Sequence, residues 1–262
     1  MNITRSILFL CLFSVTHVYA SNCVILLHGL ARTNASMSKM ETALEEAGFK
    51  TVNHDYPSTE HGIAKLSKDE ISAAIHQCSL DDTIHFVTHS LGGILVRYYV
   101  QNQGLEQLGR VVMLGPPNEG SHVVDLLRNS PGFELINGPA GQQLGTEETS
   151  IPNQLGPANF DVGIIAGSSS INLILSTMLE NPDDGKVSVD STKLEGMSDH
   201  IVLPVTHPLM MKNDEVIFQT VHFLKSGKFK HATVPDQNTE NRNYKVGNLE
   251  WFNFTVSALP TV

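Results

Sequence analysis

The strongest constraint on how this chain folds lies in residues 82–96, DTIHFVTHSLGGILV. Residues 83–87 alternate β-branched, aromatic and apolar side chains, which predicts a strand. A His-Ser-Leu-Gly-Gly corner follows at residues 89–93, and a helical apolar pattern continues through Val100. The stretch therefore predicts a strand, a sharp turn and a helix, with Ser90 at the turn. There a serine hydroxyl lies above the carboxyl edge of a sheet, beside the N-terminus of a helix, as a nucleophile requires.

Strands and helices alternate along the rest of the chain, which predicts an α/β fold with a mostly parallel central sheet and helices on both faces. Apolar runs typical of buried parallel strands predict strands at residues 23–27, 49–53, 110–114, 161–166 and 201–205. Apolar residues at helical spacing predict helices at about residues 36–47, 63–77 and 214–224. Ser36 is the expected N-cap of the first of these helices.

The regular pattern weakens between residues 121 and 159, where glycines and prolines interrupt short apolar pieces. We expect this region to form a small cap or rim over the site. The main domain then covers residues 21–227, and residues 228–262 form a polar C-terminal extension with a strand-like pattern at residues 251–256. No spacing of ligand residues indicates a metal site, so no metal is expected.

The first 20 residues have the features of a cleaved secretory signal. They carry Arg5 as their single basic residue, an apolar block at residues 7–15 and the small-residue processing site Val18-Tyr19-Ala20. The alternative is a membrane anchor, but the apolar block is much shorter than the roughly 20 residues that a bilayer span needs. The sequence therefore predicts an exported protein, periplasmic or secreted, without an integral membrane span.

The balance of charge narrows the range of partners. The chain has a formal net charge of −10, with 41% hydrophobic and 17% charged residues. This composition suits a single soluble domain. The excess of negative charge argues against binding to nucleic acid or to strongly anionic membranes.

Two cysteines, Cys23 and Cys78, remain after removal of the predicted signal. Cys23 begins a predicted strand, and Cys78 closes the helix that leads into the strand before Ser90. Both are expected at the same edge of the sheet, so a disulfide is geometrically reasonable if the two strands are neighbours. Two buried free thiols are the alternative.

A serine hydroxyl becomes nucleophilic when a base removes its proton, and a carboxylate holds that base in one tautomer. Downstream of Ser90, Asp184 stands in an Asp-Asp-Gly turn, and His207 follows the last predicted strand. The chain order serine, aspartate, histidine is the one that this architecture uses. Other residues compete for these roles, namely Asp183 and Asp199 as the acid, and His28, His89 and His200 as the base.

The chain resembles an α/β-hydrolase of the bacterial lipase and esterase type over residues 24–227. Four motifs carry the resemblance: His28-Gly29-Leu30, the corner at residues 89–93, the turn at residues 117–121, and the late Asp-Gly and His pair. The resemblance implies that Ser90 is the nucleophile, His207 the base and Asp184 the orienting acid. It also implies an oxyanion hole made by the backbone N–H groups of Leu30 and Leu91.

One residue departs from the pattern, because Thr88 occupies the first glycine position of G-x-S-x-G. A β-branched side chain there is expected to crowd the turn. The resemblance otherwise implies hydrolysis of carboxylic esters of small molecules or lipids through an acyl-enzyme on Ser90, without a cofactor. The same triad serves acyltransferases and thioesterases, and a catalytically silent hydrolase fold serves as a binding module, so these alternatives stay open.

Overall fold

The computed structural model describes residues 22–170 and 182–231. The predicted signal segment and the strand-like residues 251–256 lie outside the described residues. The chain divides into two units after Lys230, and the sheet with its covering helices belongs to the first.

Six strands form one sheet in the order β2-β1-β3-β4-β5-β6, and every neighbouring pair is parallel. The strands are β1 (Asn22–Leu27), β2 (Lys50–His54), β3 (Thr83–His89), β4 (Leu108–Leu114), β5 (Val162–Gly167) and β6 (Asp199–Leu203). The prediction of a parallel α/β sheet is therefore confirmed. Because β1 pairs with β3, the loop after β1 and the corner after β3 emerge side by side at the carboxyl edge of the sheet.

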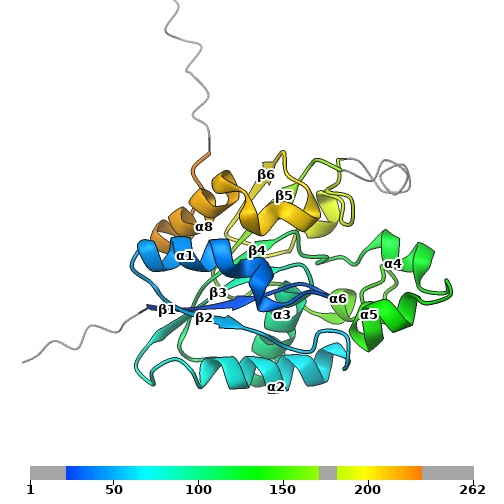
Figure 1. Ribbon diagram of the computed structural model, residues 1–262, viewed down its shortest axis with the longest axis horizontal. Helices are drawn as coiled ribbons and strands as arrows, with labels where there is room; N and C mark the ends of the chain where they lie inside the picture. The colour runs from blue at the N-terminus through cyan, green and yellow to red at the C-terminus, as the bar shows by residue number, and fades with distance from the viewer. Residues whose placement is uncertain (1–21, 171–181, 232–262) are drawn as a thin grey trace, which may run out of the picture. The chain divides into compact units, whose positions relative to one another are not determined.

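Helices cover both faces of the sheet (Figure 1). On one face lie α1 (Ser38–Glu46) and α8 (Asp214–Ser226), and on the other α2 (Ile63–Ile75) and α3 (Leu91–Gln103). Successive side chains of β1 point to opposite faces, so Val24 and Leu26 join the core under α1 and α8 while Ile25 and Leu27 join the core under α2 and α3. Among the helices that the structure describes, none is both long and apolar enough to cross a bilayer.

The predicted start of the first helix is wrong. A 3-10 turn, η1 (Asn34–Met37), precedes α1, and the Ser36 hydroxyl donates to Thr33 O at 2.8 Å. That hydroxyl closes the preceding turn and does not accept from the helix amides, so Ser36 is not an N-cap.

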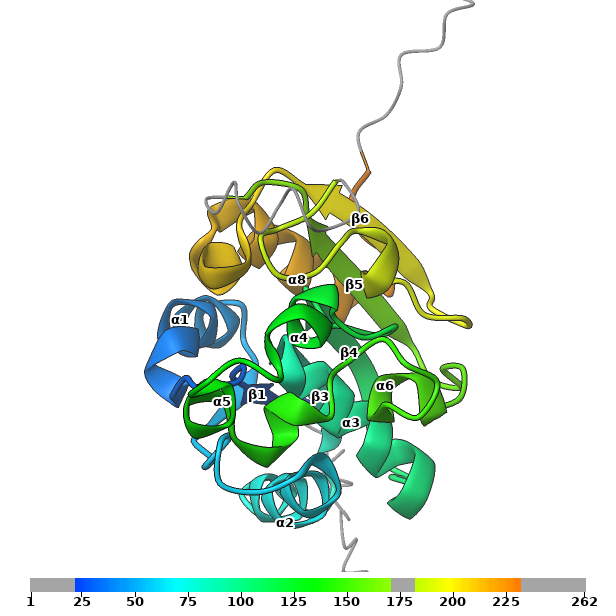
Figure 2. The same cartoon turned by 90° about the vertical axis from the view of Figure 1, so that its right-hand side faces the viewer.

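Three short helices lie between β4 and β5: α4 (His122–Leu127), α5 (Phe133–Gln142) and α6 (Ile151–Gln154). Figure 2 shows them gathered in front of the central strands. Gly138 interrupts α5 with φ of 62°, and a Cβ there would lie 1.8 Å from Thr59 O. The absence of a side chain at Gly138 therefore lets α5 pack against the loop that follows β2.

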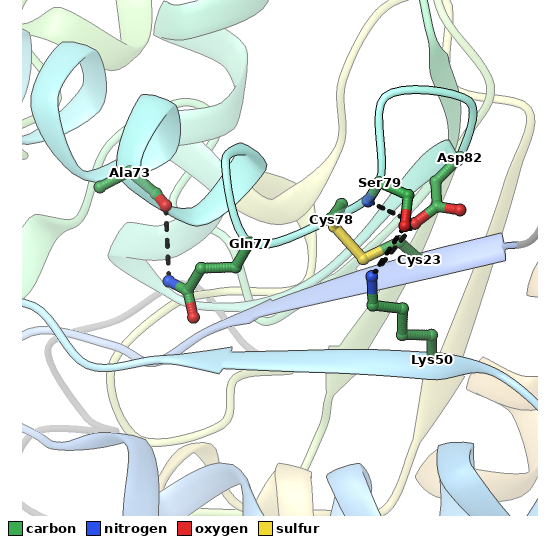
Figure 3. Close-up of a disulfide and its surroundings, with 7 residues drawn as sticks. All are labelled: Cys23, Lys50, Ala73, Gln77, Cys78, Ser79 and Asp82. Atoms are coloured by element: carbon green, nitrogen blue, oxygen red, sulfur yellow. Dashed lines mark hydrogen bonds and ion pairs between the residues drawn. A yellow bond between two sulfur atoms is a disulfide. The ribbon is translucent and has the colours of Figure 1, made fainter.

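Cys23 of β1 and Cys78, which follows α2, form a disulfide with their Cα atoms 6.0 Å apart (Figure 3). The buried Asp82 beside it accepts from Ser79 N at 2.8 Å and lies 3.4 Å from Lys50 Nζ. The bond lies at the amino end of β1, at the opposite edge of the sheet from Ser90. It ties the start of the sheet to the segment that leads into β3.

Candidate active site

Ser90 connects β3 to α3 with φ of 53° and ψ of −118°. Among the described residues, Ala31 is the only other non-glycine residue with a positive φ. Such a conformation is strained for a residue with a side chain and persists only where the surroundings enforce it. Here Ser90 N donates to Leu114 O at 2.9 Å, and Gly92 packs so closely that a Cβ would lie 2.9 Å from Leu27 O. The sheet on both sides thus fixes the corner.

Thr88 does not distort the corner. It lies within β3, fully buried, and its hydroxyl reaches Val112 O at 3.5 Å. A Cβ on Gly93 would lie 3.3 Å from Thr88 Oγ1. The crowding expected from Thr88 does not arise, because Gly93 has no side chain and so leaves space for the Thr88 hydroxyl.

Asp184 and His207 form a buried pair at the same edge of the sheet. Asp184 Oδ2 lies 2.7 Å from His207 Nδ1, and the side chains are 0% and 4% exposed. Asp184 Oδ1 accepts from Lys186 N and Val187 N at 3.0 and 2.8 Å, and His207 N donates to Asp184 O at 2.9 Å. These bonds fix the carboxylate and hold the imidazole in one orientation, which leaves Nε2 for another partner.

The competing acids and the competing late histidine lie elsewhere. Asp183 Oδ1 accepts from Gly185 N at 2.7 Å, within its own turn. Asp199 and His200 lie at the amino end of β6, where Asp199 Oδ2 accepts from Phe229 N and His200 Nε2 lies 3.0 Å from Thr192 Oγ1. The structure therefore brings Asp184, and neither alternative acid, to His207.

The two early histidines are buried supports of the loops. The ring of His89 lies 4.7 Å from that of His207, and its Nε2 donates to His207 O at 3.0 Å. Burial, and then the charge of His207, holds the pKa of His89 well below its usual value. His28 stacks on Tyr56 at 4.1 Å, and the Tyr56 hydroxyl donates to His28 O at 2.6 Å.

Within residues 22–170 and 182–231, the backbone N–H groups of Leu30 and Leu91 have no acceptor. Leu91 is the first residue of α3, where an amide has no partner within the helix. Leu30 lies in the loop after β1, and its N–H donates to no backbone carbonyl in the part of the chain that the structure describes. The neighbouring Ala31 adopts φ of 53° and donates from its N–H to Ser58 Oγ at 3.0 Å, which shapes the turn after Leu30.

Ser90 and His207 line the same cavity, whose volume is about 400 Å³. No hydrogen bond joins them among the described residues, and such contacts are often long before a substrate binds. The walls are largely apolar and come mainly from α4, α5 and the loops beside them. They include Leu30, Val123, Val124, Leu127, Phe133, Ile136, Leu144 and Val187.

Sequence reasoning missed Gly115, which follows β4 with φ of 55°. A Cβ there would lie 3.0 Å from Asp184 Oδ2 and 3.1 Å from His207 Nδ1. The sequence does contain a signal for this close approach, namely a glycine directly after β4, the strand that pairs with β3. Arg97 was also missed; it is buried on α3 and donates to Asn118 O at 2.9 Å and Leu155 O at 3.1 Å.

The parallel sheet, the strained serine corner and the late acid–base pair define the α/β-hydrolase class. A family model described as palmitoyl protein thioesterase matches residues 23–155, just over half of the 262-residue chain. The chain belongs to the palmitoyl protein thioesterase family. At the level of this family it is an ester hydrolase.

Solved structures share the fold at low sequence identity. The mature lipase BlEst2 of Bacillus licheniformis is 16% identical with a TM-score of 0.61, over 78% of this chain and 92% of that one. Phospholipase PlaB from Legionella pneumophila is 16% identical with a TM-score of 0.62, over 80% of this chain and 60% of its own. Aspergillus fumigatus lipase B is 16% identical with a TM-score of 0.60, over 78% of this chain and 52% of its own. No curated protein sequence matches the chain.

Proposed function

We propose that the protein is a serine hydrolase that cleaves carboxylic esters or thioesters through an acyl-enzyme on Ser90. The observation that carries the proposal is that Ser90 and His207 line one cavity while Asp184 holds His207 by Nδ1. The family match favours thioesters as a second substrate class beside oxygen esters. In this proposal, residues 121–159 act as a cap whose apolar wall receives the acyl chain.

The proposed mechanism assigns a role to each of these groups. His207 Nε2 takes the proton of Ser90 Oγ, which attacks the acyl carbonyl. The negative charge that develops on the carbonyl oxygen is stabilised by the N–H groups of Leu30 and Leu91, and losing one such donor typically costs about 10²- to 10³-fold in rate. His207 then protonates the leaving alcohol or thiol, and a water activated by the same histidine releases the acid.

Export is part of the proposal. The disulfide between Cys23 and Cys78 suits an oxidising compartment, and it supports the secretory signal predicted at residues 1–20. Periplasmic and secreted locations are both consistent with it.

The nucleophile is tested with a fluorophosphonate probe, which attaches covalently to activated serines. We expect labelling of the wild-type protein and none of Ser90→Ala. Absence of labelling in a wild-type protein with a normal circular dichroism spectrum would favour the silent binding module instead.

The acid is tested by paired substitutions in one turn. Asp184→Asn removes the acceptor of His207 Nδ1, and we expect kcat for a p-nitrophenyl ester to fall by about 10⁴-fold, as for other triads that lose their acid. Asp183→Asn is the matched control and should retain most activity. Loss of activity in the control alone would assign the role to Asp183.

A further inference from the structure

Two cations, Arg32 and Lys186, line the cavity that contains Ser90 and His207. Arg32 is half-buried, and its Nη2 donates to Pro208 O at 3.4 Å, so its guanidinium lies beside the residue that follows His207. Lys186 lines the cavity and is exposed to solvent.

The backbone of Lys186 is held at both of its polar groups. Its N–H donates to Asp184 Oδ1 at 3.0 Å, and its carbonyl accepts from Ser121 Oγ at 2.9 Å. Lys186 is thereby held next to Asp184, and Arg32 lies next to Pro208, which follows His207.

Neither cation has a carboxylate partner within residues 22–170 and 182–231. The ion pairs of this part of the chain involve other basic groups, such as Arg128 with Asp125 and Lys39 with Asp214. The negative charge of Asp184 raises the pKa of Lys186, but both carboxylate oxygens of Asp184 already accept hydrogen bonds. Oδ1 accepts from backbone N–H groups, and Oδ2 accepts from His207 Nδ1. Two positive charges thus converge on this cavity in a chain whose formal net charge is −10.

The electrostatics agree with this geometry. Loss of hydration lowers the pKa of Lys186, and the charge of Arg32 lowers it further. Burial lowers the pKa of Arg32. Both cations also contribute to the lowered pKa of the neighbouring His89. A bound anion would relieve this repulsion, because it is attracted to both cations at once.

We propose that Arg32 and Lys186 bind a phosphate group carried by the leaving group of the substrate. This inference rests on the proposed hydrolase function. In the proposed function the acyl chain binds the apolar wall that includes Val124 and Phe133, so we assign the anion to the alcohol or thiol part of the substrate. A planar guanidinium and an ammonium together can donate several charge-assisted hydrogen bonds to the oxygens of one phosphate group.

Two sources can present such a phosphate: the headgroup of a glycerophospholipid, or a nucleotide that carries an acyl thioester. They are distinguished with two matched pairs of short-chain substrates, used as monomers in solution. The first pair is octanoyl glycerol and octanoyl glycerol phosphate. The second is octanoyl-N-acetylcysteamine and octanoyl-coenzyme A, which share the thioester bond.

The measured quantity is the ratio of kcat/KM for the phosphate-bearing member to that for the neutral member of each pair. We expect a wild-type ratio of about ten or more in at least one pair, carried by KM. The double variant Arg32→Gln, Lys186→Gln should lower that ratio about 10- to 100-fold, the range for losing charge-assisted hydrogen bonds. Selectivity in the first pair alone identifies a lipid headgroup, and in the second alone a nucleotide-borne phosphate.

The matched control is Lys68→Gln, which removes an exposed charge on α2 and should leave both ratios unchanged. Wild-type ratios near one in both pairs, or an equal loss in the control, would overturn the proposal. Fluorophosphonate labelling of Ser90 in the same preparations separates this failure from failure of the hydrolase function, since a labelled enzyme without phosphate selectivity contradicts only the role of Arg32 and Lys186.

Discussion

At the scale of single residues, the contact between Asp184 and His207 depends on the absence of a side chain at Gly115. An alanine there would place its Cβ about 3 Å from both Asp184 Oδ2 and His207 Nδ1. Since displacement of a catalytic group by about 1 Å can cost 10²-fold, we expect Gly115→Ala to lower kcat about 10- to 100-fold. The measurement is steady-state ester hydrolysis on protein whose urea midpoint is also recorded.

Gly104 offers the matched control for that substitution. It too has a positive φ, 70°, but no atom lies within 4 Å of a Cβ built on it. Gly104→Ala therefore also strains a backbone with positive φ, at a cost of about 1–3 kcal/mol, without touching the site. Equal kcat values for the two variants would show that Gly115 acts only through stability.

At this scale, the sequence predicts the role of a residue well when the residues that define the role are close together in the chain. Ser90 and its two following glycines stand within five residues, so their roles can be inferred from the motif alone. Gly115 and Arg32, in contrast, contact residues that are far away in the sequence: Gly115 approaches Asp184, and Arg32 bonds to Pro208 O. No periodic pattern in the sequence predicts such contacts. Arg97 likewise binds carbonyls of another element, so from the sequence it is indistinguishable from any helical arginine.

At the scale of elements, the disulfide joins β1 to the end of α2. The crosslink closes a sequence separation of 55 residues, for which loop-closure entropy predicts about 4 kcal/mol of stabilisation. We expect Cys23→Ala, Cys78→Ala to lower the free energy of unfolding by about 2–4 kcal/mol, measured by urea denaturation of the full chain. Because the bond lies at the amino edge of the sheet, kcat at 25 °C should stay close to that of the wild type.

A reduced wild-type sample provides the comparison for this prediction. Mild reductant should bring its urea midpoint to that of the double variant, while the double variant itself should not respond. A variant as stable as the oxidised wild type would show that the segment between Cys78 and β3 is held without the crosslink, by contacts such as those of Asp82.

The elements themselves were predictable to different degrees. Buried strands such as β1 are continuous apolar runs, and the pattern places them within one or two residues. The start of α1 was misplaced because Ser36 bonds back to Thr33, a local competition that composition does not resolve. The short helices α4 to α6 were expected only as an irregular cap, because tertiary contacts such as the fit of Gly138 against Thr59 stabilise them.

At the scale of the whole molecule, buried histidines couple folding to pH. His28, His85 and His89 are at most 5% exposed, and burial is the main cause of the lowered pKa of each. The unfolded chain binds protons at these groups near pH 6.5, while the folded chain binds them only at lower pH. The contribution of these neutral histidines to the free energy of unfolding is therefore complete above about pH 6.5, and it is lost as the pH falls through their pKa values in the folded protein.

We accordingly expect the free energy of unfolding to fall between pH 6.5 and 5, by up to about 1.4 kcal/mol per pH unit for each histidine. Carboxylates such as Glu147, whose pKa is lowered to about 2 by Arg128, titrate below this window.

The variant His85→Gln isolates the contribution of one histidine. The His85 ring forms hydrogen bonds with Asn22 and with Arg110 N at the amino edge of the sheet, remote from Ser90. The urea midpoint of this variant should decline less steeply with acidification, whereas His76→Gln, exposed at the end of α2, is the control. Identical slopes for wild type and His85→Gln would mean that other groups control the acid response.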